Sequence, residues 1–476
     1  MKKQIEVREV SVPQGRDRLL ISKDIFRAYD IRGKYPEEIN STVFNKIGLA
    51  LGTKIISKNS DPVIICRDGR TSSKELADSL VEALMECGIE VIDIGTLPTP
   101  LMNFSLHKSK IKNGLMITGS HNPKNYNGVK MVVDNLTIYG EHIEELYDII
   151  KKRDFIKSNK KGSYLQDKTI ADDYIKYVSQ NIEIKTNLKV VVDCGNGITG
   201  PLVNNICKSF NLNHKIINET VDGAFPNHPP DPTNPENLHQ IREALNESKA
   251  DLGIAFDGDG DRMILIKNDG EIIWPDQLMI IFSTQILKSK KGKIVYDIKC
   301  SKHLNDSILE NGGEPIVSRT GHSFIKKSMR ENNAILGGEM SGHIFFNDKW
   351  FGFDDGVYAF LRIMELLPDK KDYDKIFNNL PQSVTTPEIA IQFKENNHFT
   401  FMNKFVKLAE FDDSKKIDID GLKVIYDDGW GLIRCSNTTS CIVLRFEADN
   451  KNSMNRIQSK FRDAMLKIDK NLEIPF

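Results

Sequence analysis

Asp251-Leu252-Gly253-Ile254-Ala255-Phe256-Asp257-Gly258-Asp259-Gly260-Asp261-Arg262 joins an apolar run to three carboxylates that alternate with glycines. The apolar run indicates a buried strand. The glycines let the following loop turn tightly, so that alternate side chains converge. Converging carboxylates repel one another unless a cation neutralises them, and oxygen ligands favour a hard ion such as Mg²⁺. The sequence therefore predicts a metal site formed by Asp257, Asp259 and Asp261 at the end of a strand.

Two other interpretations of this loop are weaker. An EF-hand calcium loop requires Gly at its sixth position and Glu at its twelfth, where this chain has Arg262 and Asn268. The flanking residues also read as strands, since Met263-Ile264-Leu265-Ile266 follows the loop. A solvated acidic turn is the plainer interpretation of three acids, but it does not account for their regular alternation with glycine after an apolar run.

Length and composition limit the classes of protein that fit. The chain has 476 residues, 39% of them hydrophobic and 28% charged, which indicates roughly three or four soluble domains. Lys+Arg is 65 and Asp+Glu is 66, so no net charge attracts the protein to nucleic acid or to an anionic membrane. No apolar run approaches the roughly 18 residues of a membrane span. We expect a cytoplasmic protein whose seven scattered cysteines are reduced and structural.

A layout of strand, helix, strand, helix and strand occurs three times, which is typical of βαβ units around mainly parallel sheets. The expected strands are 62–66, 90–93 and 114–117; then 189–193, 214–217 and 251–256; then 293–297, 314–317 and 334–336. The expected helices between them are 74–87 and 100–108; 202–210 and 236–246; and 303–311 and 323–331. From about Val384 the segments become shorter, and they end in an expected helix at 450–468.

This pattern predicts an α/β protein with three related α/β domains, whose sheets are mixed and mainly parallel, plus a C-terminal α+β domain. The expected domains are 1–167, 168–268, 269–381 and 382–476. The third strand of each unit precedes an unusual loop. These loops are Thr118-Gly119-Ser120-His121-Asn122-Pro123, the Asp-Gly loop, and Gly338-Glu339-Met340-Ser341-Gly342-His343. Because ligands of open α/β sheets bind outside the carboxyl ends of strands, the three loops are expected to meet in one central cleft.

Ser120 lies in a turn between Gly119 and His121-Asn122-Pro123. It could cap a helix. A serine-hydrolase role is unfavourable, because the motif G-x-S-x-G requires Gly where Thr118 stands. His121 follows directly and is not expected to point the same way as Ser120. A serine that carries a phosphoryl group fits better, because the neighbouring metal loop would neutralise the phosphoserine.

Gly195-Asn196-Gly197-Ile198-Thr199-Gly200 follows a strand and precedes a helix, and Glu219 lies about twenty residues further on, as in a dinucleotide-binding fingerprint. Against that interpretation, Asp193 ends the strand where a pyrophosphate requires positive potential. A tight strand-to-helix turn is the favoured role for this motif.

Two further segments indicate phosphate binding. Gly431-Leu432-Ile433-Arg434-Cys435-Ser436-Asn437-Thr438-Thr439 sets a guanidinium beside hydroxyl groups, which suits a phosphate monoester, although such clusters are more often ordinary turns. Arg27-Ala28-Tyr29-Asp30-Ile31-Arg32-Gly33 places two arginines around a tyrosine, and alone it could be a surface salt-bridge cluster.

Together these segments resemble the α-D-phosphohexomutase superfamily, most closely its bacterial phosphomannomutase/phosphoglucomutase branch. The matching motifs are distributed in order over nearly the whole chain: Phe26–Gly33, Thr118–Pro123, Asp257–Arg262, Gly338–His343 and Arg434–Thr439. The resemblance implies four domains around a deep central cleft, in agreement with the repeat described above. Small departures are Cys435, where a smaller residue is usual, and Ser440, where proline is common.

The resemblance also implies a role for each matching position. Ser120 is implied to be a phosphoserine that binds Mg²⁺ together with Asp257, Asp259 and Asp261, and Lys130 resembles a general acid/base. The other positions implied to act in catalysis are Arg32, His121, Arg262 and His322. The positions implied to bind substrate are Tyr29, Lys299, Glu339, Ser341, His343, Arg434, Ser436, Asn437 and Thr438. Of these, the last four are implied to hold the phosphate that does not react.

The implied reaction interconverts hexose 1-phosphate and hexose 6-phosphate, of mannose, glucose or both. It passes through a hexose 1,6-bisphosphate, which also serves as activator, and the bisphosphate turns end for end between two half-reactions. That turn makes a hinge near 380–386 plausible. Phosphoglucosamine mutase and a non-catalytic sugar-phosphate sensor remain alternatives, and an NAD enzyme is a distant third. Apart from the phosphorylated hexose, no nucleic acid or membrane partner is expected, and the protein is expected to be a monomer or weak dimer.

Overall fold

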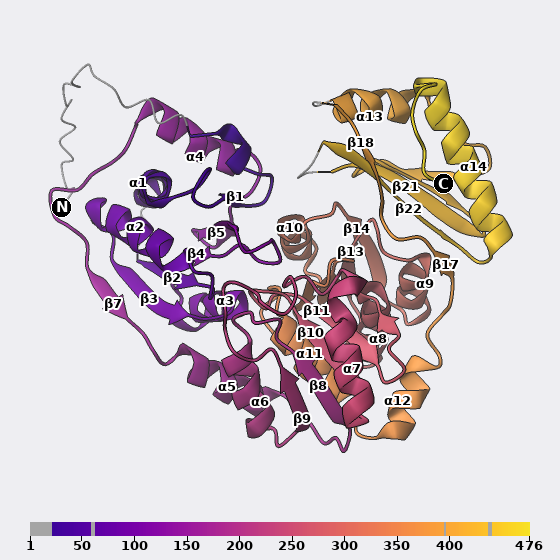
Figure 1. The fold of residues 1–476 in the computed structure, drawn as a ribbon, viewed down its shortest axis with the longest axis horizontal. Coiled ribbons are helices and arrows are strands. Elements are labelled where there is room, and N and C mark those ends of the chain that lie inside the picture. The colour runs from indigo at the N-terminus through magenta and orange to yellow at the C-terminus, as the bar shows by residue number, and fades with distance from the viewer. Residues whose placement is uncertain (1–20, 59–61, 395–396, 437–439) are drawn as a thin grey trace.

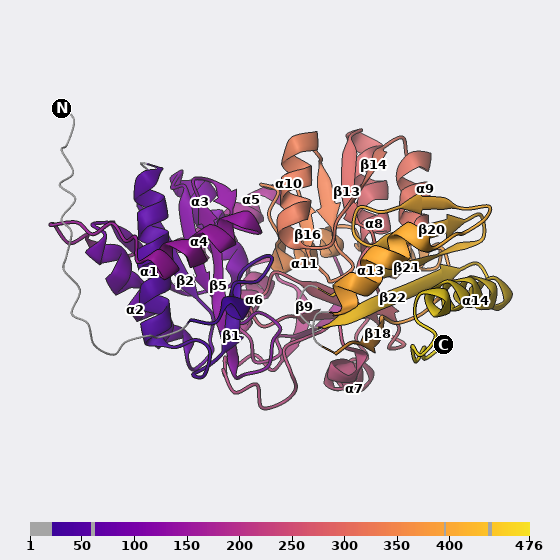
Figure 2. The ribbon, with the colours of Figure 1, turned by 90° about the horizontal axis from the view of Figure 1, so that it is seen from above.

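The computed structural model describes residues 21–58, 62–394, 397–436 and 440–476. These residues form four sheets, one in each of four successive domains. The first and fourth domains lie at opposite ends of the molecule, and the second and third lie between them (Figure 1, Figure 2). No helix in the described ranges is long and apolar enough to cross a membrane.

The first domain is a mixed sheet covered by helices. Its strands are β1 (Ile31–Lys34), β2 (Val63–Arg67), β3 (Val91–Thr96), β4 (Asn113–Ile117), β5 (Tyr126–Val133), β6 (Leu136–Thr137) and β7 (Tyr164–Gln166). Its helices are η1 (Lys23–Ile25), α1 (Ser41–Ser57), α2 (Ser73–Glu86), α3 (Thr99–Ser109) and α4 (Glu141–Lys152). Strands β7, β3, β2 and β4 are parallel, whereas β5 runs antiparallel between β4 and β1. Helix α1 approaches α2 closely because Gly48 faces Ala83, where a Cβ atom would lie 2.7 Å from the alanine methyl.

The second and third domains repeat this arrangement. The second contains α5 (Ile170–Asn181), β8 (Lys189–Asp193), α6 (Gly200–Ser209), β9 (Asn213–Ile217), η2 (Pro235–Leu238), α7 (His239–Ser248), β10 (Leu252–Phe256), β11 (Met263–Lys267) and β12 (Ile272–Ile273). The third contains α8 (Pro275–Ser289), β13 (Lys293–Asp297), α9 (Lys302–Glu310), β14 (Glu314–Ser318), α10 (His322–Asn332), β15 (Leu336–Gly338), β16 (Ile344–Phe346), α11 (Gly356–Glu365) and α12 (Lys370–Phe377).

One feature of the topology positions the site. In each of the three domains the third parallel strand turns back into an antiparallel strand, as β4 does into β5, β10 into β11, and β15 into β16. The connecting loops are the Ser120 loop, the Asp-Gly loop and the Gly338–His343 loop. All three therefore leave the carboxyl end of an equivalent strand.

The fourth domain is built differently. Its strands are β17 (Val384–Thr385), β18 (Ile389–Gln392), β19 (Lys415–Ile417), β20 (Leu422–Tyr426), β21 (Gly429–Cys435) and β22 (Cys441–Ala448), and each pairing among them is antiparallel. Its helices are α13 (Asn397–Leu408) and α14 (Lys451–Ile468). The fourth domain has its own hydrophobic core, which includes Phe405, Phe446 and Phe461.

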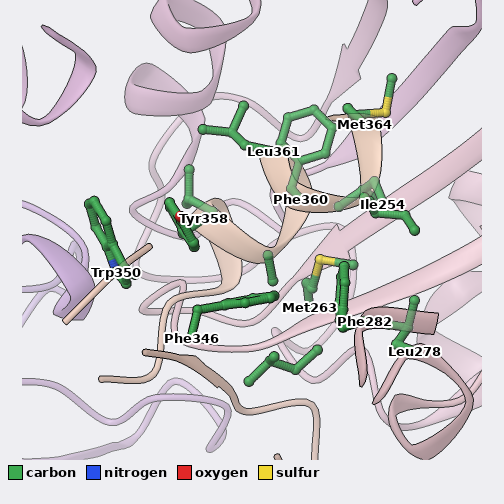
Figure 3. Close-up of a cluster of buried hydrophobic side chains, with 14 of the residues drawn as sticks. Ile254, Met263, Leu278, Phe282, Phe346, Trp350, Tyr358, Phe360, Leu361 and Met364 are labelled. Atoms are coloured by element: carbon green, nitrogen blue, oxygen red, sulfur yellow. The ribbon is translucent and has the colours of Figure 1, made fainter. Parts of the chain in front are cut away.

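The largest hydrophobic core runs through the first three domains without a break. Figure 3 shows its aromatic part, where Phe346, Tyr358 and Phe360 gather beside Met263 of the second domain and Phe282 of α8. A continuous core makes the first three domains one packed unit, on which the equivalent loops are held at fixed positions.

The expected α/β fold is confirmed, and each of the nine runs expected to be strands forms one. The strand expected at 334–336 starts only at Leu336, because the amide of Ala334 is still bonded to the Met329 carbonyl at the end of α10. Helix α7 starts at His239 rather than at residue 236, because Pro235 opens a short 3₁₀ turn. Strand β12 pairs with β11 and so extends the second sheet past residue 268, where the sequence placed a domain boundary. Six of the seven cysteines are buried, and Cys435 is partly exposed.

Candidate functional site

Ser120 and the Asp-Gly loop are in direct contact. The Ser120 hydroxyl donates to Oδ2 of Asp257 at 3.0 Å, and Ser120 is 1% exposed. Its backbone has a left-handed φ of 49°, and its amide donates to the Thr118 hydroxyl at 2.7 Å. The His121 ring lies beside it, with Nδ1 3.3 Å from the Ser120 Oγ. The sequence expectation that His121 points away from Ser120 is therefore wrong, because the left-handed turn at Ser120 brings both side chains to one side.

Arg70 holds the Ser120 loop from beneath. Its guanidinium donates to the carbonyl oxygens of four residues in and after the loop, which are Ser120, Asn122, Pro123 and Tyr126, at 2.6–3.0 Å. Asp68 accepts from the Arg70 Nε at 3.2 Å and from the Thr118 hydroxyl at 2.8 Å. Gly119 leaves room for this arrangement, since a Cβ atom there would lie 2.5 Å from the guanidinium carbon. The serine is thus held in a rigid cradle.

Asp257, Asp259 and Asp261 are fully buried, and one carboxylate oxygen of each lies within 4.8 Å of the others. Oδ1 of Asp259 and Oδ1 of Asp261 accept no hydrogen bond from the described residues. Buried carboxylate oxygens without donors are costly unless a cation binds them. The donor set, all oxygen, fits a hard divalent ion. This loop could therefore hold a metal ion.

Lys130, on β5, partly neutralises the same carboxylates. Its ammonium donates to Asp259 at 2.7 Å and also to Asp261. Burial on its own lowers the pKa of Lys130, but Asp259 and Asp261 outweigh it and raise that pKa above the ordinary value. Thr99, at the start of α3, donates its hydroxyl to Asp259 as well. Lys130 is thus placed beside two of the three carboxylates.

The Gly338–His343 loop contacts the Asp-Gly loop through Arg262, the last residue of the Asp-Gly motif. Arg262 Nε donates to the His343 Nε2 at 2.9 Å. On the other side of the ring, the His343 Nδ1 lies 3.2 Å from Asp354. His322 stacks on His343, with ring centroids 5.4 Å apart, and its Nδ1 is 3.5 Å from the same carboxylate. Burial, and then Lys326, lower the pKa of His322 well below its ordinary value.

The remaining part of the third loop faces α10. Glu339 is 2% exposed and accepts from the amide of Gly321, at the start of α10. Burial raises the pKa of Glu339. Ser341 is half-buried in the same turn.

In the first domain, Arg32 donates to the Gly119 carbonyl at 3.3 Å and to Asn122 and Asp30. Arg32 therefore lies against the Ser120 loop.

The fourth domain meets the others around Tyr29 and Lys299. The Tyr29 hydroxyl donates to the Thr320 carbonyl at 2.8 Å, and the Thr320 amide donates to Asp420 at 3.1 Å. Asp420 in turn accepts from the Arg434 Nε at 3.1 Å. The Lys299 ammonium donates to Glu388 at 3.0 Å. The phosphate-binding candidates of the fourth domain are thus linked to the first and third domains.

The remaining phosphate-binding candidates follow Arg434 in the sequence. Ser436 is buried at the end of β21, whereas Asn437 and Thr438 lie outside the described residues. Burial raises the pKa of Cys435 to about 11, so this residue is not a reactive thiolate at neutral pH.

The glycine-rich segment at 195–200 forms a tight turn between β8 and α6. The Ile198 amide donates to the Gly258 carbonyl at 3.1 Å, and a Cβ atom at Gly197 would lie 2.9 Å from that oxygen. Glu219 pairs with Asn204 on α6. The segment therefore supports the Asp-Gly loop, in agreement with the turn that the sequence favoured.

Four known protein-family domains match four consecutive segments of the chain. The family descriptions that match are phosphoglucomutase/phosphomannomutase alpha/beta/alpha domains I, II and III, at residues 23–157, 172–270 and 274–384, and the C-terminal domain, at 388–464. The chain belongs to the phosphoglucomutase/phosphomannomutase family. The superfamily indicated by the sequence motifs is thereby confirmed.

Individual relatives of this family agree over nearly the full length. A phosphomannomutase/phosphoglucomutase of Pseudomonas syringae pv. tomato is 41% identical, over 96% of this chain and 98% of its own. A phosphoglucomutase of Neisseria meningitidis serogroup A is 40% identical, over 96% and 99%. A crystal structure of a phosphoglucomutase/phosphomannomutase family protein from Burkholderia thailandensis, 41% identical, matches with a TM-score of 0.91 over 96% of this chain and all of its own. These relatives confirm the prediction of a hexose-phosphate mutase, an isomerase, and do not favour the alternatives.

Several residues of the site were not marked by sequence reasoning. They are Asp68, Arg70, Thr99, Asp354, Glu388 and Asp420. The first two carried a usable signal, because Asp68-Gly69-Arg70 follows β2 at the same edge of the sheet as the Ser120 loop. The roles of the other four residues can be recognised only from the structure, because their partners are in distant segments of the chain.

Proposed function

We propose that the protein is a phosphomannomutase/phosphoglucomutase that interconverts the 1-phosphate and 6-phosphate of mannose, glucose or both. The proposal has Ser120 as phosphoserine and a hexose 1,6-bisphosphate as intermediate and activator. The observation that carries it is the contact of the Ser120 hydroxyl with Asp257, at 3.0 Å, which joins two of the three equivalent loops. The relatives named phosphomannomutase/phosphoglucomutase support the choice of sugars.

We assign the metal site to Asp257, Asp259 and Asp261, completed by the phosphoryl group on Ser120. The oxygen donors and the carboxylate oxygens without donors favour Mg²⁺. When bound, the ion supplies positive charge next to the transferring phosphoryl group. Arg262, whose Nε lies 3.8 Å from Asp257, adds a fixed cation at the same place.

The proposed transfer is a simple exchange of bonds. The bond between phosphorus and the Ser120 Oγ breaks, and a bond forms from phosphorus to the free hydroxyl oxygen of the hexose monophosphate. The hydroxyl proton leaves to a base and is returned to the Ser120 Oγ, so charge and protons balance. His121 and Lys130 are the assigned groups for these proton movements: His121, beside the Ser120 Oγ, has a pKa lowered by burial and can accept a proton, and Lys130, protonated beside Asp259, can give one. Arg32 holds the loop in place.

The other assigned residues bind the sugar phosphate. Glu339, Ser341 and His343 are proposed to bond the sugar hydroxyls, and His322 lies stacked on the last of these. The phosphate that does not react is assigned to the fourth domain, with help from Tyr29 and Lys299. Its ligands there are proposed to be Arg434, Ser436, Asn437 and Thr438. Because the same two phosphate sites serve both half-reactions, the bisphosphate can return its other phosphate to Ser120 after turning around.

Mass spectrometry combined with a transfer assay tests this proposal. The purified protein is first treated with glucose 1,6-bisphosphate, and the phosphorylated peptide is identified. It is then mixed with Mg²⁺ and the 1-phosphates of glucose, mannose and glucosamine in separate reactions. We expect phosphate on Ser120 that exchanges with the glucose and mannose substrates as these are converted to their 6-phosphates, with no transfer by Ser120→Ala. Stable phosphate on Ser120 with no turnover would instead indicate a sensor, and glucosamine phosphate as the best substrate would overturn the choice of sugars.

We also propose that the protein is a monomer or weak dimer. The support is indirect, since all four sheets and their cores are completed within one chain. Light scattering during size exclusion at several protein concentrations measures this directly.

A further inference from the structure

Three successive carbonyl groups of the turn after β13 are held by cations from the fourth domain. The Lys423 ammonium, on β20, donates to the Ile298 carbonyl at 2.8 Å and to the Cys300 carbonyl at 3.0 Å. Arg445, on β22, donates to the Lys299 carbonyl between them at 2.8 Å. The turn that carries Lys299 is therefore fixed on both sides by one neighbouring domain.

These cations are buried and well satisfied. Lys423 and Arg445 are each 6% exposed. The Lys423 ammonium also lies over the Trp430 ring, 3.8 Å from its centroid. Burial lowers the pKa of Lys423 to about 8, against the opposing effect of Glu447. Burying a cation costs free energy, and apolar contacts would hold two domains together at lower cost. Two buried cations on one short turn therefore indicate a role beyond holding the domains together.

The side chain of Lys299 is also directed by the fourth domain, because its ammonium donates to Glu388 at 3.0 Å. On the third-domain side, Asp297 accepts from the Lys299 amide at 3.0 Å and from the Met340 amide at 3.3 Å. Met340 belongs to the loop assigned to sugar binding. A continuous set of hydrogen bonds therefore runs from the fourth domain, through the Lys299 turn, to that loop.

We propose that Lys423 and Arg445 are positioning residues that set the Lys299 ammonium for the sugar phosphate. The contacts that dock the fourth domain on the third then also place the Lys299 ammonium beside the substrate. The inference rests on the proposed function, in that Lys299 contacts the substrate. A purely structural role for the two cations predicts a loss of stability without a change in the kinetics of the folded protein.

The test compares two lysines of the same domain interface. Lys423→Met removes two bonds to the Lys299 turn. Lys302→Met removes a bond to the Asp427 carbonyl and an ion pair with Asp449, also between the third and fourth domains, but leaves the turn untouched. We expect Lys423→Met to raise KM for hexose 1-phosphate about tenfold or more, the effect of losing a charged hydrogen bond, with a smaller change in kcat. Lys302→Met is expected to leave KM unchanged, and Lys423→Arg to restore most of the parent KM.

Arg445→Lys serves as a milder second variant if Lys423→Met does not fold, and a smaller rise in KM is expected, because the lysine keeps a charge but loses the guanidinium geometry. The double variant Lys299→Met/Lys423→Met is expected to bind substrate no more weakly than Lys299→Met alone, because both changes act on one group. A raised KM in Lys299→Met but not in Lys423→Met or Arg445→Lys would overturn the positioning role alone. An unchanged KM in Lys299→Met would overturn the substrate contact of Lys299, and the positioning role with it.

Discussion

Ser120 and Asp257, 137 residues apart in sequence, are joined by a hydrogen bond of 3.0 Å from the serine hydroxyl to the carboxylate. The bond crosses from the first domain to the second. A phosphoryl group on Ser120 would replace this donor with acceptor oxygens beside three buried carboxylates. The two states of the serine therefore require different partners, and the phosphorylated state has the greater need of a cation.

Removal of divalent metal should consequently affect the two states differently. We expect chelation by EDTA to abolish phosphoryl transfer and Mg²⁺ to restore it. We also expect Mg²⁺ to raise the melting temperature of the phosphorylated protein more than that of Ser120→Ala. Thermal melts of both proteins with and without Mg²⁺ measure this. Full activity in EDTA would contradict the metal assignment.

Asp259→Asn should reduce phosphoryl transfer far more than stability. The asparagine keeps an oxygen that can accept from Thr99, and it removes one of three repelling charges. It also removes a metal ligand and a partner of Lys130. We expect at least a roughly hundredfold loss of kcat, comparable to removal of a group that stabilises transition-state charge, with a small shift in melting temperature.

The control for that variant is Asp269→Asn. Asp269 lies in the turn after β11 and forms an exposed ion pair with Lys267. This change should leave kcat unchanged. Parallel losses of activity and melting temperature in Asp259→Asn would mean that the carboxylate is a structural group.

Arg70→Lys should destabilise the first domain. The guanidinium serves four carbonyl oxygens and Asp68 at once, whereas an ammonium has three donors and a different shape. We expect a loss of about 3 kcal/mol in the free energy of unfolding, the usual cost of breaking a buried charged network. Urea unfolding followed by fluorescence measures it. Arg67→Lys, which affects a part-exposed pair with Asp93, should cost less.

The positions of the loops could be predicted from sequence because strand identity is a local property. Apolar runs such as Lys189–Asp193 and Leu252–Phe256 are buried on both faces of a parallel sheet. Each strand can therefore be predicted from its own unbroken run of apolar residues. Once the strands are known, the rule that ligands bind at their carboxyl ends brings Ser120 and Asp257 together.

The partners of the site residues could not be predicted in the same way. The contact of His343 with Asp354 depends on the turn between β16 and α11, and that of Arg434 with Asp420 depends on the register of β20 against β21. The direction of His121 depended on a left-handed backbone at Ser120, which a residue other than glycine rarely adopts. Such details follow from tertiary packing rather than from local pattern.

Asp355 should make stability depend on pH in a direction opposite to that of an ordinary surface carboxylate. It is fully buried at the start of α11, where Oδ1 accepts from the Tyr358 amide at 2.8 Å and Oδ2 from the Tyr174 hydroxyl at 2.9 Å. Burial raises its pKa from 3.8 to about 7. Between these values the folded protein binds more protons at this group than the unfolded chain does, so its contribution to stability falls as pH rises.

Asp355→Asn should remove this dependence. Asparagine keeps an oxygen for the Tyr358 amide and so preserves the cap of α11, but it carries no charge to bury. We expect the variant to melt at a higher temperature than the parent at pH 8 and to lose most of that advantage at pH 5. Asp369→Asn, which changes the N-cap of α12 in the same chemical way, is the matched control. Thermal melts at the two pH values test this, because a variant that melts below the parent at both pH values would mean that Asp355 is ionised and stabilising in the folded protein.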